Sequence, residues 1–343
     1  MTSRSRSLRR GAVAALAVTL AVATTAGIAG ARSASAAPEL PPVTPEELVA
    51  SVLDAEPVAL AGTVAVDNRL GLPAIPGAPE GALTDGASTA RVWSDGTGRG
   101  RLALPRPDGE RTYVRDGAVT WAYDSGDRTA TRIPAKPGGE STDAQGADPQ
   151  ARAREIVASL RDSSVVTVDG TTEVAGRPAY TLVLAPRPGE RTVLREVRAA
   201  VDAETRMPLE LSVLGAGPEP VLRAGFDDVT VGPQDPALFT FTPPPGATVQ
   251  DAPAREPRPD GRPGDRERPR TVGDGWDAVA VGSVPSGEGT ERVDPAAVGA
   301  PVSGPWGSGH AITTAAGSAI LTDDGRFAAG AVGTDVLGAA LAR

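Results

Sequence analysis

The chain has 343 residues, with 34 Lys and Arg against 43 Asp and Glu, so its formal net charge is −9, and it contains no cysteine. The lack of cysteine excludes disulfides, thiol catalysis and a lipid-modified N-terminal cysteine. The acidic balance argues against nucleic acid as a partner and against electrostatic docking on anionic lipid.

Residues 1–36 have the pattern of a secretory signal peptide. Four arginines precede the apolar residues 11–30, and Ala34 and Ala36 are the small residues that signal peptidase requires before Ala37. An uncleaved membrane anchor is the alternative, because about 20 apolar residues can span a bilayer. We expect the mature chain to be exported to the cell envelope or secreted, and not to be lipid-anchored.

A helix is predicted to begin at Thr44, which can cap it. Pro45 suits the first helical position, Glu47 can complete a capping box, and Pro57 marks the end. The apolar face of this helix is formed by Leu48, Val49, Val52 and Leu53.

Short alternating strands follow, separated by turn dipeptides such as Asp108-Gly109 and Asp116-Gly117. Alternation places Leu102 with Leu104 on one face, and Val119, Trp121 and Tyr123 together on another. The strands expected in this half are 58–68, 87–94, 99–104, 110–115, 118–123 and 128–133.

Two stretches are predicted to be long loops: residues 70–85, which are rich in proline and glycine, and residues 136–150, which are polar and Gly-rich. A second helix is predicted to start at Asp148-Pro149 and to present Ile156, Val157 and Leu160 to the core.

The second half of the sheet is predicted as an antiparallel meander, because its apolar segments are separated by closely spaced turns. Its strands are expected at 179–184, 193–201, 209–214 and 222–231, before the closing stretch 239–247.

Residues 251–270 are rich in proline, arginine and acids, which is typical of a solvated linker. Beyond them, residues 271–343 are predicted to form a small domain that leans on the main one. It should contain apolar segments at 276–281, 311–321, 327–332 and 336–341, a turn at Asp323-Asp324-Gly325, and a closing helix capped by Thr334.

No catalytic constellation is found in the sequence. His310 is the single histidine and is interpreted as structural or exposed. The acidic stretch 124–127 lacks the pattern of a calcium loop and is interpreted as a turn. We expect a protein that is not an enzyme and uses no cofactor or metal.

Aromatic residues are few, yet Trp93, Tyr113, Trp121 and Tyr123 gather in the first group of strands. They could form ordinary core or line an apolar pocket, and the spacing leaves both interpretations open.

Three motifs resemble the second half of LolA-like proteins, a family that includes lipoprotein carriers and RseB/MucB-type regulators of envelope stress. They are Gly-Arg-Pro-Ala-Tyr at 176–180, Val-Asp-Ala-Glu-Thr-Arg-Met-Pro-Leu at 201–209, and Phe-Thr-Phe-Thr-Pro-Pro-Pro-Gly at 239–246. Over residues 42–250 the resemblance implies a mainly β (α+β) fold: a curved antiparallel sheet forming an unclosed half-barrel, helices plugging its concave side, and a cavity for acyl chains.

The predicted organisation is a signal peptide (1–36), a lipid-binding half-barrel (37–250), a linker (251–270) and a small C-terminal domain (271–343). The predicted function is to carry acyl lipid or lipidated protein. The alternatives are a sensor that binds a membrane-anchored anti-sigma factor through its C-terminal domain, and a structural envelope domain with a filled core. The candidate cavity lining is Trp93, Leu102, Leu104, Tyr113, Val119, Trp121, Tyr123, Tyr180, Leu182, Leu211 and Val213.

Overall fold

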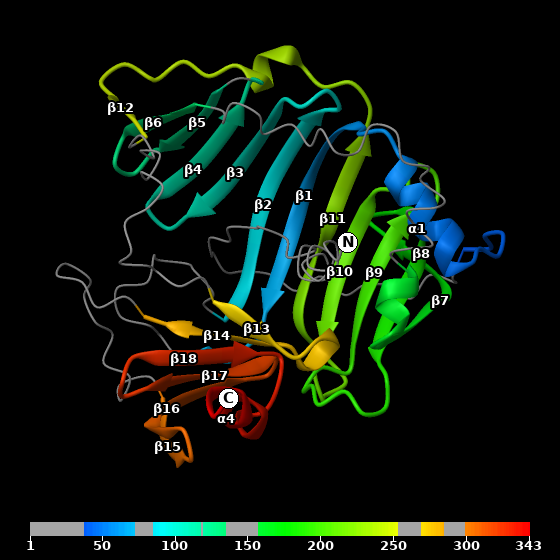
Figure 1. Cartoon of the computed structure of the whole chain (residues 1–343). Helices are drawn as coiled ribbons and strands as arrows, with labels where there is room; N and C mark the ends of the chain where they lie inside the picture. Colours follow the sequence, from blue (N-terminus) through cyan, green and yellow to red (C-terminus); the bar gives the residue numbers. More distant parts are fainter. Residues whose placement is uncertain (1–37, 73–84, 118, 135–156, 253–268, 285–298) are drawn as a thin grey trace, which may run out of the picture.

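The computed structural model describes residues 38–72, 85–117, 119–134, 157–252, 269–284 and 299–343 (Figure 1). The predicted signal peptide, most of the loop 70–85, the whole loop 136–150, the start of the second helix and most of the linker 251–270 lie outside these residues. None of the described helices is long and apolar enough to cross a membrane.

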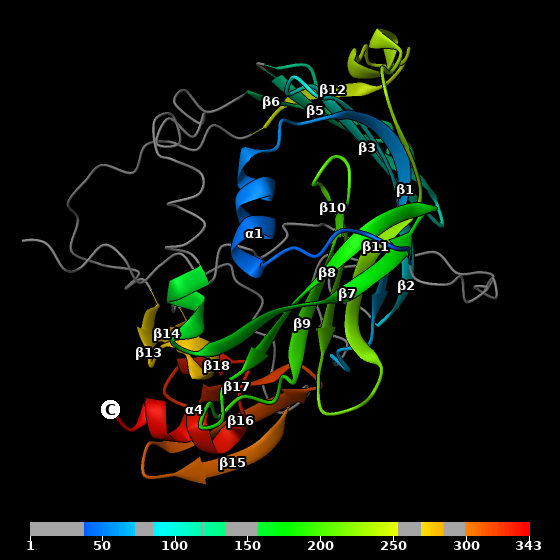
Figure 2. The same cartoon turned by 90° about the vertical axis from the view of Figure 1, so that its right-hand side faces the viewer.

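Twelve strands form one open, strongly curved sheet (Figure 2), in the order β12-β6-β5-β4-β3-β2-β1-β11-β10-β9-β8-β7. The prediction of a mainly β fold with an unclosed curved sheet is confirmed. All neighbours are antiparallel except β12, which runs parallel to β6. The strands are β1 (Ala59–Asn68), β2 (Gly86–Asp95), β3 (Gly100–Arg106), β4 (Gly109–Arg115), β5 (Val119–Asp124), β6 (Thr129–Pro134), β7 (Ser164–Val174), β8 (Arg177–Pro186), β9 (Glu196–Asp202), β10 (Pro208–Leu214), β11 (Pro220–Val231) and β12 (Thr248–Asp251).

The helix α1 (Pro45–Asp54) lies on the concave side of the sheet (Figure 2). Its predicted capping box is present: the Glu47 amide donates to the Thr44 side chain, and the Thr44 amide donates to the Glu47 carboxylate. Leu48 is fully buried and packs with Tyr180 and Val201 of the sheet. Of the predicted second helix, the structure describes the end, where Val157 is buried.

A segment between β11 and β12 crosses the opposite, convex side of the sheet. It contains the 3-10 helix η2 (Pro236–Phe239), which contacts β3 and β4, and Phe239 is fully buried. Phe241 follows, with its ring centroid 5.6 Å from both Trp121 and Tyr123. The closing stretch predicted at 239–247 therefore covers one face of the first strands and then adds β12 to the sheet edge.

The C-terminal part forms a second sheet of six strands in the order β13-β14-β18-β17-β16-β15. The helix α4 (Thr334–Leu341) packs on it, and together they enclose a core that includes Ile320, Val332 and Leu337. The remaining elements are β13 (Arg270–Val272), the 3-10 helix η3 (Gly275–Asp277), β14 (Val279–Ser283), β15 (Ala300–Gly304), β16 (Gly307–Thr314), β17 (Gly317–Thr322) and β18 (Arg326–Gly330).

The structure adds to or differs from the sequence prediction at three places. The apolar stretch 311–321 is not one strand: it is split into β16 and β17, and Gly317 at the split has φ +157, where an added Cβ would meet the Gly330 carbonyl. Thr334 does not cap the closing helix, because Gly333 occupies the N-cap. β7 was not predicted as a separate strand, because its outward side chains are mostly polar.

Candidate functional site

Strand register defines two faces of the twelve-stranded sheet. Side chains directly opposite each other on paired strands lie on the same face. Tyr180 and Val201 form one such pair and pack against Leu48 of α1. We call the face that carries them, which is the concave side of the sheet, the inner face. The opposite side, on which Phe241 packs against Trp121 and Tyr123, is the outer face.

An apolar row runs along the inner face from β8 to β4. From β8 to β1 the row passes through residues that lie opposite each other on neighbouring strands: Leu182, Ala199, Leu211, Ala224 and Val66. It then follows β1 through Val64 to Gly62. From Gly62 it continues across the next strands through Val92, Leu102 and Tyr113. Val213, Val197 and Leu184 form a parallel row one step along the same strands. The inner face is thus apolar across eight neighbouring strands.

Most of this face is only half-buried, although its side chains are as apolar as a core. The end under α1 is tightly covered, since Tyr180 is 5% exposed and Val201 is 3% exposed, and Val66 and Leu104 are also buried further along the face. The half-buried members are Val64, Val92, Leu102, Tyr113, Leu182, Leu184, Val197, Ala199, Leu211, Val213, Leu222 and Ala224.

The register divides the eleven predicted lining residues between the two faces. Seven lie on the inner face: Leu102, Leu104, Tyr113, Tyr180, Leu182, Leu211 and Val213. The other four, Trp93, Val119, Trp121 and Tyr123, lie on the outer face. The separation of Leu102 and Leu104 from Val119, Trp121 and Tyr123 agrees with the alternation in the sequence.

The four outer residues have their own partners. Trp121 and Tyr123 contact Phe241, and the Trp93 ring lies between the guanidinium groups of Arg91 and Arg101, at 5.6 and 5.9 Å. We therefore omit these four from the candidate site. The aromatic residues of the first strands therefore do not form one pocket: Tyr113 lies on the inner face, and Trp93, Trp121 and Tyr123 lie on the outer face.

Sequence reasoning missed several inner-face residues that the structure adds. Leu184 continues the alternation of Tyr180 and Leu182 on β8. The others lie on strands from which no lining residue was predicted: Val197 and Ala199 on β9, and Leu222 and Ala224 on β11. The same period-2 pattern could have found them, had it been followed along each strand and not only around the aromatic residues.

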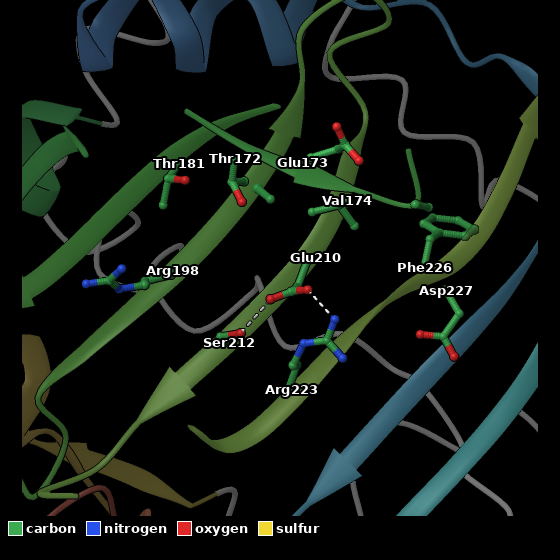
Figure 3. Close-up of a pocket in the computed structure, with 12 residues that line it drawn as sticks. Thr172, Glu173, Val174, Thr181, Arg198, Glu210, Ser212, Arg223, Phe226 and Asp227 are labelled. Atoms are coloured by element: carbon green, nitrogen blue, oxygen red, sulfur yellow. Dashed lines mark hydrogen bonds and ion pairs between the residues drawn. The ribbon is translucent and has the colours of Figure 1, made fainter. Parts of the chain in front are cut away.

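The outer face carries a polar cavity of about 360 Å³ beneath the end of β7 (Figure 3). The two arginines of its lining are paired within the fold: Arg223 with Glu210 at 2.5 Å, and Arg198 with Glu196 at 3.0 Å. Thr172, Thr181 and Ser212 complete a lining of hydroxyls. This cavity differs in face and in polarity from the apolar cavity that the sequence predicted, and we keep the inner face as the candidate site.

A buried ion pair fixes the turn that leads from β9 to β10. The Asp202 carboxylate is 1% exposed and accepts hydrogen bonds from Arg177 Nε at 2.5 Å and Nη2 at 2.9 Å, and from the amides of Glu204 and Thr205. Burial raises the pKa of Asp202, but the hydrogen bonds from Arg177 and Thr205 outweigh it and lower the pKa to about 2. Two of the three family-like motifs, at 176–180 and 201–209, supply this pair.

The two sheets are joined at the lower end of β7 to β9. Trp276 of η3 donates from its indole nitrogen to the Ser164 hydroxyl at 2.7 Å, and its amide donates to Glu190 at 2.9 Å. Thr192 forms a β-bridge with Val332, and Arg191 pairs with Asp335 at 2.6 Å. The second sheet therefore contacts the strands whose upper parts form the covered end of the inner face.

Two polar residues singled out in the sequence, Asp124 and His310, lie on strands β5 and β16. Asp124 accepts from the Gly126 amide within its turn and pairs with Arg106 at 2.9 Å. His310 lies on β16, opposite Leu321. No group of three or more potential metal ligands occurs in the part of the chain that the structure describes.

The fold and the apolar inner face define a class of protein: a mainly β chain with an open curved sheet around a partly covered apolar surface. No protein-family model matches the chain, and no curated protein has a significantly similar sequence.

Solved structures of similar shape include a chain of the Pseudomonas aeruginosa MucA/MucB complex, with 19% identity, 86% of this chain and 94% of that chain covered, and a TM-score of 0.44. LprF from Mycobacterium bovis has 11% identity and a TM-score of 0.27, with 60% and 100% covered. A LolA-superfamily protein from Nitrosomonas europaea has 12% identity and a TM-score of 0.24, with 58% and 99% covered. MucB and LolA-superfamily proteins are the groups that the sequence motifs resemble.

Proposed function

We propose that the mature chain, residues 37–343, is an exported, non-enzymatic protein that shields acyl chains of a lipid or a lipidated polypeptide on its inner face. The observation that carries the proposal is the row of mostly half-buried apolar side chains that crosses eight strands of the inner face. Apolar surface of this extent is expected either to be covered or to receive a ligand.

The dimensions of the face support an acyl ligand. Neighbouring strands are about 4.8 Å apart, so eight strands span roughly 34 Å. One leaflet of a bilayer is about 15 Å deep, half of the hydrocarbon core, and its chains would therefore cross three or four strands. Ten buried methylenes contribute about 8 kcal/mol, before the cost of association, without any polar contact.

Native mass spectrometry of the mature protein, purified without detergent and then offered a phospholipid or a lipopeptide, tests the proposal. We expect adducts of lipid mass that disappear on denaturation. Val213→Glu places a carboxylate on the inner face and should abolish the adducts, because a charge cannot be buried against an acyl chain without a partner.

Val165→Glu is the matched control. Val165 lies on β7, opposite Ala185 on the outer face, and is 43% exposed. This variant should bind lipid as the wild type does. A clean protein mass for the wild type after incubation with lipid would contradict the carrier proposal and favour a structural domain with a filled core.

The second candidate is a sensor, in which the same face detects lipid and residues 271–343 bind a membrane-anchored regulator. The contacts of Trp276 and Arg191 between the two sheets favour it, because they connect the C-terminal part to the strands of the inner face. A carrier should still take up lipid after residues 271–343 are removed. For a sensor, that truncation should abolish binding of the regulator while leaving lipid uptake intact.

A further inference from the structure

Among the residues that the structure describes, no acidic side chain pairs with Arg206 at the covered end of the inner face. Arg206 lies in the turn between β9 and β10 with φ +62, a conformation unusual for a residue other than glycine. The turn is held by Asp202, which accepts the Glu204 and Thr205 amides, and by the Arg206 amide, which donates to the Asp202 carbonyl at 3.2 Å. The hydrogen bonds of the turn thus fix the backbone position of Arg206.

The guanidinium group of Arg206 lies against the inner-face residue Tyr180. Its Cζ is 5.3 Å from the centroid of the Tyr180 ring. Tyr180 packs with Leu48 of α1, and its hydroxyl donates to the carbonyl of Pro41 at 3.0 Å. Arg206 is therefore at the end of the apolar row, beside α1 and the segment that leads into it.

The Nη1 group of Arg206 is buried, and among the described residues it has no hydrogen-bond partner. A buried donor without an acceptor costs about 1–3 kcal/mol, and more when the group is charged. The nearest acids in the sequence are already used, because Asp202 and Glu204 both pair with Arg177, at 2.5 and 3.0 Å. The fold thus retains an unused cationic donor beside an apolar surface.

We propose that Arg206 anchors the anionic head group of the acyl ligand, binding a carboxylate or phosphate oxygen, while the chain extends from Tyr180 along the inner face over Leu182 and Leu211. This inference rests on the proposed function and adds the ligand's class: a lipid with an anionic head. The planar guanidinium group can form two parallel hydrogen bonds with such oxygens. Since Nη1 is buried, neighbouring groups must shift to admit the head group.

The test compares two probes with the same acyl chain, one with an anionic and one with a neutral head group: 11-(dansylamino)undecanoic acid and its methyl ester. Each is titrated into the mature full-length protein. We expect the acid to bind about 10-fold more tightly than the ester, because a hydrogen bond to a charged group is lost in the ester. The affinity of Arg206→Gln for the acid should fall to its affinity for the ester, while its affinity for the ester should equal that of the wild type.

Arg111→Gln is the matched control. Arg111 is exposed and lies on the inner face of β4, with its guanidinium 5.6 Å from the ring centroid of Tyr113, so it repeats the arginine–tyrosine contact at the other end of the sheet. This variant should retain the preference for the acid. Arg206→Lys should retain part of it, because lysine keeps the charge but lacks the planar group.

The possible results separate the two proposals. Unchanged binding of the ester to Arg206→Gln would show that the variant is folded, so its loss of preference for the acid would support the anchor. Equal binding of acid and ester by the wild type, or loss of the preference in Arg111→Gln instead of Arg206→Gln, would overturn the anchor and leave acyl binding standing. If neither probe binds the wild type, the acyl-binding function itself is wrong, and the anchor with it.

Discussion

Loss of Asp202 should clearly destabilise the first sheet, because Asp202 is a buried carboxylate that accepts hydrogen bonds from Arg177 and from the backbone of its own turn. Asp202→Ala leaves the Arg177 guanidinium without its main partner. We expect a loss of roughly 3 kcal/mol in the free energy of unfolding at neutral pH, measured by urea denaturation. Glu204→Ala is the control: Glu204 also pairs with Arg177 but is 84% exposed, so the cost should be below about 0.5 kcal/mol.

The same carboxylate gives a pH dependence of defined sign. Its pKa is lowered from 3.8 to about 2 in the folded chain, so the unfolded state binds the proton first. The stabilisation by Asp202 is complete above about pH 4 and is lost as the pH falls through about 2. The stability difference between wild type and Asp202→Ala should therefore shrink over that interval, as followed by urea unfolding at several pH values. A difference that stays constant down to pH 2 would contradict this account.

At the residue scale, the sequence predicted the apolar character of the site but not all its members. Leu102 and Leu104 could be assigned to one face and Trp121 to the other from alternation alone. Which face is concave could not be deduced, because that depends on Phe241, more than 100 positions further along the chain, packing on Trp121. The unpaired state of Arg206 was equally hidden, since it follows from Arg177 taking both neighbouring acids.

Among the elements that pack on or form the first sheet, the helix α1 is the one we expect to open locally most readily. Its contacts with the sheet centre on Leu48, and its first turn depends on the capping box of Thr44 and Glu47. Thr44→Ala should destabilise the helix by about 1 kcal/mol. Hydrogen exchange should accordingly become several-fold faster in residues 45–54 while the amides of β8 and β9 keep their protection. Equal acceleration in the strands would indicate that α1 does not open independently.

The segment that crosses the outer face should contribute more to stability than α1. Phe239 is fully buried against β3 and β4, so Phe239→Ala should cost about 3–5 kcal/mol in the free energy of unfolding. Phe241 is half-buried, and Phe241→Ala should cost clearly less. Thermal unfolding of the two variants checks the order. If Phe241→Ala were the more damaging, the contact with Trp121 and Tyr123 would outweigh the burial of Phe239.

Local signals identified most elements, and the misses have physical causes. The capping box located α1 because its residues interact within one turn. The break between β16 and β17 was missed because Ala315 and Ala316 carry no turn signature, and the hairpin depends on the conformation of Gly317. β12 was missed because a four-residue exposed strand is recognised only through its partner β6.

At the scale of the whole molecule, the question is whether the two sheets act as one body. Their contacts are specific: the Trp276 indole and amide reach Ser164 and Glu190, and Thr192 bridges to Val332. They involve the beginning of β7 and the loop between β8 and β9, at the opposite end of these strands from the Asp202 turn. A ligand that changed the curvature of these strands would therefore be sensed at the second sheet.

Cleavage within residues 253–268 provides a direct test of this coupling. With a protease site inserted there, the mature protein can be cut after folding, so both sheets are formed before the covalent connection is lost. We expect the two pieces to co-elute in size-exclusion chromatography at micromolar concentration, because the contacts of Trp276, Thr192 and Arg191 remain. Trp276→Ala removes the indole packing and its hydrogen bond to Ser164, and should let the cut pieces separate.

Arg343→Ala serves as the control for that variant, because Arg343 is an exposed residue lining a shallow pocket on the second sheet with Arg270 and Arg326. Its loss should leave the cut pieces together. Repeating the separation with and without bound lipid then distinguishes the two candidate functions. A sensor requires lipid to change the affinity between the pieces, since coupling between two sites is reciprocal, whereas a carrier requires the affinity to stay the same. Separation of the wild-type pieces without any substitution would show that the interface is too weak for the second sheet to respond to the first.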